Sequence, residues 1–163
     1  MNIRKAELSY LPQIVEVYRC AKAYMNSHGN PTQWKDGYPL PELLEEDISS
    51  GQLYVVENEG AIHGAFVFAL GEDPTYREVQ GEQWQLDEPY GTIHRIASDG
   101  KVKGIFGAAL TFCKSIRRYI RADTHEANLT MQNVMKKYGF QQRGIIICAD
   151  GTPRIAFELL PNQ

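Results

Sequence analysis

The sequence contains no long basic stretch and no long apolar stretch. Seventeen Lys and Arg residues stand against twenty Asp and Glu residues, the formal net charge is -3, and no run of Lys or Arg exceeds two residues. This balance lacks the electrostatic signature of a protein that binds nucleic acid or an acidic membrane. No apolar run approaches the roughly 18 residues of a membrane span, and no signal peptide is evident. We therefore expect a soluble, cytoplasmic protein whose partner is a small molecule.

Cysteine is also scarce. The chain has three cysteines, at Cys20, Cys113 and Cys148, an odd number spread far apart in the sequence. This pattern does not indicate a disulfide framework. Two of the three lie in otherwise apolar segments, so we expect reduced, buried thiols.

Two nucleotide-binding motifs and a metal-binding pattern are missing as well. Neither G-x-x-x-x-G-K-[ST] nor G-x-G-x-x-G occurs, which weighs against an ATP-binding protein. The group Asp123, His125 and Glu126 has no further ligands at a diagnostic spacing, so we expect no metal site.

The residues that are present alternate between strand and helix patterns and predict one domain, 1–163. Ser9 is expected to cap the first helix and Asn128 the last, while Gly51 and Gly139 follow helix ends. The strands on either side of the third helix need a crossover and are therefore expected to be parallel. The fold class is α/β, with helices on both faces of a mixed sheet. Strands are expected at 2–6, 53–56, 62–70, 92–98, 119–124, 144–148 and 154–159, and helices at 11–25, 42–50, 104–118 and 128–138.

The most informative stretch is 92–110, where an apolar strand breaks into a glycine-bearing loop and restarts with helical spacing. The first turn of a helix has unpaired N–H groups and aligned dipoles, and glycine lets the backbone approach an anion closely. The stretch therefore predicts a site for a phosphate-bearing ligand.

This order of elements resembles the GCN5-related N-acetyltransferase (GNAT) family. The resemblance rests on Lys101-Val-Lys-Gly104-Ile-Phe-Gly107 at the third helix and on Asn128-x(10)-Gly139-Phe140 at the fourth. The family pattern is Gln/Arg-x-x-Gly-x-Gly/Ala; here Phe106 stands at the second glycine position and Gly107 is displaced by one.

The resemblance implies a mostly antiparallel sheet of six to seven strands with a splayed central parallel pair. It also implies transfer of an acetyl group from acetyl-CoA to a primary amine of a small molecule or protein, without a metal. The alternative is a non-catalytic acyl-CoA-binding module of the same fold. A homodimer is a further expectation, from the family and from the aromatic residues in the loops.

The family also implies cofactor contacts. The strand before the motif is expected to pair with the pantetheine arm, the loop and helix N-terminus to hold the pyrophosphate, and Asn128 to contact the pantetheine or simply to cap its helix. The expected cofactor residues are Ile96, Ala97, Ser98, Val102, Lys103, Gly104, Ile105, Phe106, Gly107 and Asn128.

The catalytic groups are less defined. The family often has a tyrosine acid seven residues after the asparagine, but here that residue is Met135. Tyr138, almost one helical turn further on, is the candidate substitute. His94 is the candidate base, because imidazole titrates near neutral pH and residues 92, 94 and 96 are expected to share a face; His125 is the reserve.

Loop aromatics are the candidates for the acceptor site. Trp34, Tyr38 and Trp84 are expected to contact the amine, and packing against the core is the alternative for each. No motif in the sequence identifies the amine that accepts the acetyl group.

Overall fold

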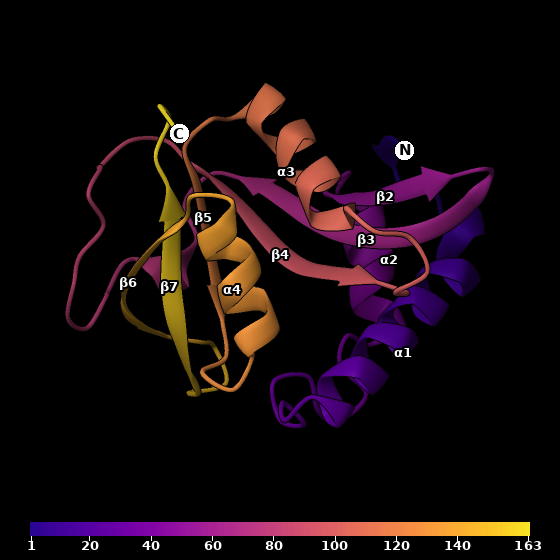
Figure 1. The fold of residues 1–163 in the computed structure, drawn as a ribbon, viewed down its shortest axis with the longest axis horizontal. Coiled ribbons are helices and arrows are strands. Elements are labelled where there is room, and N and C mark those ends of the chain that lie inside the picture. Colours follow the sequence, from indigo (N-terminus) through magenta and orange to yellow (C-terminus); the bar gives the residue numbers. More distant parts are fainter.

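The computed structural model describes residues 1–163 and contains a seven-stranded sheet with helices on both faces (Figure 1). Across the sheet the strands run in the order β1-β2-β3-β4-β5-β7-β6. In chain order they are β1 (Asn2–Lys5), β2 (Leu53–Asn58), β3 (Ala61–Leu70), β4 (Gly91–Ser98), β5 (Ile120–Thr124), β6 (Gln141–Ile147) and β7 (Pro153–Leu159).

The helices cover the sheet in two pairs. Apolar residues of α1 and α2, such as Ile14 and Leu44, form one buried cluster with one face of the sheet, while Ile105 of α3 and Met135 of α4 belong to the cluster on the other face (Figure 1). This arrangement confirms the predicted fold class. The helices are α1 (Leu11–Ser27), α2 (Pro41–Ser49), α3 (Ile105–Ile116) and α4 (Leu129–Lys137), with 3-10 turns η1 (Leu8–Tyr10) and η2 (Pro74–Tyr76).

The pair β4 and β5 is the only parallel pair of strands, and it is short. Pairing is limited to Gly91 with Ile120 and Thr92 with Arg121. Beyond Thr92 the two strands separate, which confirms the expected splayed pair. The separation leaves the C-terminal half of β4 without a strand partner on its β5 side.

A bulge in β4 corrects one expectation about its faces. Val67 pairs with His94 and Ala65 with Ala97, so β4 has one more residue than β3 in this interval, and Arg95 has φ 49°. Residues 92, 94 and 96 were expected to share a face, but the extra residue turns His94 and Arg95 to the α1–α2 face while Ile96 packs against the α3–α4 cluster.

Two smaller expectations also change. Ser9 does not cap α1, because it lies inside the turn η1, which runs directly into the helix. Only Cys113 is buried; Cys20 and Cys148 are half-buried, because both lie at the wall of the cavity described below. None of the helices has the length and hydropathy that a membrane crossing requires.

Candidate active site

A cavity of about 840 Å³ lies where β4 and β5 separate. Its walls come from α1, the loop 28–40, β4, β5, α4 and the turn between β6 and β7. Segments far apart in the sequence therefore meet at this point. The residues predicted from the sequence that line the cavity are Trp34, Tyr38, His94, Ile96, Ala97, Ser98, Phe106 and Asn128.

The loop that enters α3 presents a row of free backbone donors. The N–H groups of residues 102–107 donate no hydrogen bond within the chain, and the first paired one is that of Ala108, to Gly104 O at 3.0 Å. Gly104 has φ 86°, a left-handed conformation that glycine adopts without strain. Ser98 Oγ and Asp99 Oδ1 accept from the N–H groups of Gly100 and Lys101 and so fix the start of the loop. Free donors at a helix N-terminus suit a phosphate-bearing group.

Both backbone features fit the CoA portion of the expected cosubstrate. The free N–H groups suit a pyrophosphate, and the unpaired edge of β4 at Ile96, Ala97 and Ser98 suits an extended arm that contains amides. Of residues 102–107 only Phe106 lines the cavity; Ile105 and Val102 pack in the cluster on the α3–α4 face, and Lys103 is exposed.

His94 forms a pair with Asp73 of the loop before η2. His94 Nε2 lies 3.0 Å from Asp73 Oδ2, and Asp73 Oδ1 accepts from the N–H and hydroxyl of Thr75 at 2.9 and 2.7 Å. Burial opposes ionisation of Asp73, but the hydrogen bonds from His94 and Thr75 outweigh it and lower the pKa of Asp73 to about 2. An ionised carboxylate only accepts, so the proton of neutral His94 lies on Nε2 and Nδ1 has a free lone pair.

A second carboxylate, Asp123 of β5, also lines the cavity. The hydroxyl of Tyr76 donates to Asp123 Oδ2 at 2.6 Å, and Oδ1 accepts no hydrogen bond from the chain. Burial is the main reason that the pKa of Tyr76 lies well above its usual value, so its hydroxyl remains a donor. Sequence reasoning missed Asp73 as a binding residue and considered Asp123 only as a metal ligand, because no spacing relates either residue to His94.

The loop 28–40 is tied to the start of α4. Gln33 Oε1 accepts from Asn128 Nδ2 and from Asn30 Nδ2, both at 2.9 Å. Asn128 Oδ1 accepts from Met131 N at 3.0 Å, which confirms the predicted cap. Both polar atoms of the Asn128 side chain therefore have partners within the chain.

The two loop aromatics lie at the cavity wall and also pack against other rings. Trp34 lies 5.6 Å from Tyr18 and 6.3 Å from Tyr38 between ring centroids. The hydroxyl of Tyr38 accepts from Arg95 at 3.2 Å. The two roles weighed from the sequence, packing and acceptor contact, are thus compatible for Trp34 and Tyr38.

The structure does not bring Tyr138 to the cavity. α4 ends at Lys137, and the Tyr138 ring turns outward against Phe106 and α3, where it lines a separate shallow groove with Gly104 and Gly107. A Cβ on Gly107 would collide with the Tyr138 hydroxyl. Met135 is buried and lines the cavity instead.

Trp84 and His125 also lie outside the cavity lining. Trp84 donates to Tyr76 O at 2.8 Å and stacks on the guanidinium of Arg121 at 4.2 Å. His125 Nδ1 accepts from Ala127 N at 2.9 Å, and burial lowers its pKa. The structure has no group of three or more His, Cys, Asp or Glu side chains placed to hold a metal ion.

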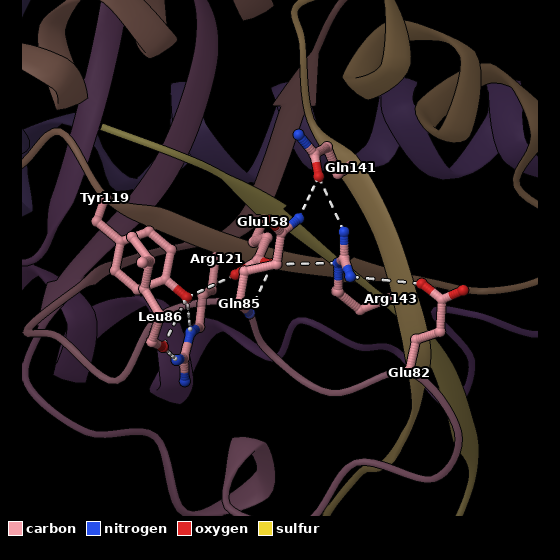
Figure 2. A network of polar contacts seen from close by, with 8 residues as sticks. All are labelled: Glu82, Gln85, Leu86, Tyr119, Arg121, Gln141, Arg143 and Glu158. Atoms are coloured by element: carbon pink, nitrogen blue, oxygen red, sulfur yellow. Dashed lines mark hydrogen bonds and ion pairs between the residues drawn. The ribbon is translucent and has the colours of Figure 1, made fainter. Parts of the chain in front are cut away.

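A second polar network lies at the other end of β5 (Figure 2). Glu158, which is fully buried, accepts from Tyr119 Oη at 2.6 Å and from Gln85 N at 2.9 Å, and its Oε1 lies 3.1 Å from Arg143 Nε. Arg121 donates to Tyr119 Oη and to Leu86 O at 3.1 and 2.9 Å. Both oxygens of Glu158 thus have partners.

Known structures place this arrangement in a family. A GNAT-family acetyltransferase from Streptococcus agalactiae 2603 matches with 30% identity and a TM-score of 0.86 over 98% of this chain and 94% of its own. The chain belongs to the GNAT family. Neither a protein-family model nor a curated protein matches the sequence.

Two more distant structures share the fold. A GNAT-family acetyltransferase from Listeria monocytogenes 4b F2365 has 22% identity and a TM-score of 0.68, with 97% of this chain and 94% of its own covered. The ribosomal-protein-S18-alanine N-acetyltransferase from Escherichia coli has 13% identity and a TM-score of 0.61, with 97% and 92% covered. GNAT membership supports acetyl transfer in general for this chain.

Proposed function

We propose that residues 1–163 form one acetyltransferase domain that transfers an acetyl group from acetyl-CoA to a primary amine by direct attack. The observation that carries the proposal is the cavity at which the unpaired edge of β4 meets His94 with its Asp73 partner, with the loop of free backbone donors following directly from that edge. Acetyl-CoA supplies the thioester that the amine attacks.

The backbone does most of the cosubstrate binding in this proposal. The N–H groups of residues 102–107 bind the pyrophosphate, and the free edge of β4 from Ile96 to Ser98 pairs with the amides of the arm. Lys103, exposed in the loop, adds positive charge. The displaced second glycine of the motif is tolerated because the donors are backbone groups.

His94 is the base that accepts the proton of the acceptor amine. Asp73 orients the ring through Nε2, so the free Nδ1 is the accepting atom. The negative charge of Asp73 then stabilises the imidazolium that forms.

Cys113 and Cys148 do not serve as acetyl carriers in this proposal. Burial, with a contribution from the charge of Asp123, raises the pKa of Cys148 to about 11, and burial raises that of Cys113 to about 12. Thiolates are the nucleophilic form, and neither thiol ionises near neutral pH. We therefore propose direct transfer without an acetyl group on either of these two thiols.

No dedicated acid is assigned to the departing thiolate. Met135 occupies the family's tyrosine position and cannot donate, and Tyr138 lies in the outer groove. A thiol with a pKa of about 8.5 is a good leaving group even without protonation.

Two measurements test the proposal. Acetyl-CoA titrated into the protein in a calorimeter should bind at micromolar concentration, and thiol release in the presence of primary amines should continue over many turnovers. No binding at millimolar acetyl-CoA contradicts the proposal. Binding without turnover for any amine favours the alternative, a non-catalytic acyl-CoA-binding module, which Met135 and Phe106 would suit.

The homodimer stays a prediction. Light scattering at high protein concentration tests it, and a monomer there contradicts it.

A further inference from the structure

The charges around the cavity are not balanced. Among its cationic side chains, Arg95 pairs with Asp47 at 2.6 Å. Arg154 and Lys35 act on Asp150, whose pKa is lowered first by its hydrogen bonds from Thr152 and then by these two charges. The lining contains five Asp side chains against three Lys and Arg side chains, so its net charge is negative.

Asp73 and Asp123 remain without a Lys or Arg partner. Asp73 contacts His94 and Thr75, and Asp123 contacts the neutral hydroxyl of Tyr76. Tyr76 donates to Asp123, and its ring lies 6.2 Å from that of His94, the partner of Asp73, so the two carboxylates lie at the same end of the cavity. The cation Arg154 also lines the cavity, but it forms no ion pair with either carboxylate. A half-buried carboxylate without a cation is costly, and a positively charged ligand removes that cost.

Asp123 is the better placed of the two to hold a ligand. Asp73 uses Oδ2 for His94 and Oδ1 for Thr75, whereas Asp123 Oδ1 has no donor within the chain. Tyr76 is buried and fixes the Asp123 side chain through Oδ2, which leaves Oδ1 available at the cavity wall.

The remaining wall also suits a cation. Trp34 and Tyr38 line the cavity, and aromatic faces attract ammonium groups. A carboxylate-bearing acceptor, by contrast, would add a further negative charge beside Asp73 and Asp123.

We propose that the acceptor is a diamine or polyamine, with its reacting amine at His94 and a second ammonium group bound by Asp123 Oδ1. This inference rests on the proposed acetyltransferase function. A bond between ammonium and carboxylate is a charge-assisted hydrogen bond, worth about 1.5–3 kcal/mol or roughly 10- to 100-fold in binding.

Three acceptors of the same length test the inference with thiol release as the readout: 1,4-diaminobutane, butylamine and 4-aminobutyrate. We expect kcat/KM for the diamine to exceed that for butylamine by about 10-fold or more, and 4-aminobutyrate to be the poorest. Equal kcat/KM for diamine and butylamine overturns the inference, as does a preference for 4-aminobutyrate or for a peptide amine. This comparison needs only the unmodified chain.

Asp123→Asn then locates the second ammonium group. Its KM for 1,4-diaminobutane is expected to rise about 10-fold or more, with kcat and the KM for butylamine little changed. Asp87→Asn is the matched control at an exposed site outside the cavity lining, and it should retain the preference. An unchanged diamine preference in folded Asp123→Asn overturns the assignment.

Failure of this inference is distinguishable from failure of the proposed function. Turnover of all three amines without a charge preference removes only the diamine. No acetyl-CoA binding, or no thiol release with any amine, removes the enzyme itself. Calorimetric titration of 1,4-diaminobutane into the protein alone then decides whether the cation site exists, and no binding overturns it.

Discussion

The two ends of β5 lie beside carboxylates of opposite character, the buried Glu158 of β7 at one end and the half-buried Asp123 at the other. Around Glu158 each carboxylate oxygen has a partner, and the residue does not line the cavity between β4 and β5 (Figure 2). Around Asp123 one oxygen is bonded to Tyr76 and the other has no donor, and the residue faces a cavity of about 840 Å³.

The difference separates a structural role from a binding role. A satisfied network holds elements together and has no capacity left for a ligand, whereas an unsatisfied carboxylate at a cavity wall has a bonding position free. Glu158 joins β5, β6 and the segment before β4 through Tyr119, Arg143 and Gln85. We therefore expect substitutions at the two ends to affect different measurements.

The largest expected effect of a substitution on activity is at the cavity. His94→Ala should lower kcat/KM for the best amine by about 10²- to 10³-fold, because general base catalysis contributes about that much. The dissociation constant of acetyl-CoA, measured by calorimetry, should stay within about twofold, since the cosubstrate is bound by backbone groups. A loss of acetyl-CoA affinity that matches the loss of rate would show that His94 is only a structural residue.

At the Glu158 end of β5, a substitution should mainly change the stability of the fold. Glu158→Gln removes a buried charge that contacts Arg143 and Tyr119, and we expect a loss of about 3 kcal/mol in the free energy of unfolding. Asp123→Asn, the matched change at the Asp123 end, should lose less than about 1 kcal/mol, because the Asn side-chain oxygen can still accept from Tyr76 and no Lys or Arg loses an ion-pair partner. Urea denaturation measures both, and equal losses would erase the distinction between the two ends.

The pH dependence of stability gives a smaller effect. Because the pKa of Asp73 is lowered from 3.8 to about 2 in the folded chain, its ionised form stabilises the fold above about pH 4, and this contribution is lost as the pH falls toward 2. The difference in unfolding free energy between the unmodified chain and Asp73→Asn should therefore shrink over that interval. A constant difference from pH 5 to pH 2 would mean that Asp73 is not held ionised by His94 and Thr75.

The smallest effect is expected for Tyr138→Phe. Its hydroxyl lies in the outer groove rather than at the cavity, so kcat should change by less than about twofold, within the range of an ordinary surface substitution. Steady-state thiol release checks this, with His94→Ala as the positive control. A fall of two orders of magnitude would restore Tyr138 as the acid and contradict the absence of a dedicated donor.

The fold followed from sequence because its signals are local. Hydrophobic periodicity and glycine positions predicted each helix and the parallel pair around α3, and the cap at Asn128 was identified from residue type alone. The bulge at Arg95 was not predicted. Nothing in the β4 sequence marks an extra residue, because the bulge is defined only by the pairing of β4 with β3.

Of the candidate site, only the backbone features could be predicted from the sequence; whether they bind a cosubstrate stays a prediction. The turn before α3 is a continuous segment, so its donors were visible in the sequence. His94, Asp73 and Asp123 come from separate segments, and only the folded sheet places them together. Tyr138 was selected by helical spacing, but α4 ends before it and the ring turns away.

The most direct test is a crystal structure of the protein with CoA and 1,4-diaminobutane. The expected result places the pyrophosphate within about 3 Å of N–H groups from residues 102–107, the thiol between β4 and β5, and an ammonium group at Asp123 Oδ1. CoA bound in the outer groove beside Tyr138, or a cavity that takes up no CoA at millimolar concentration, would contradict it.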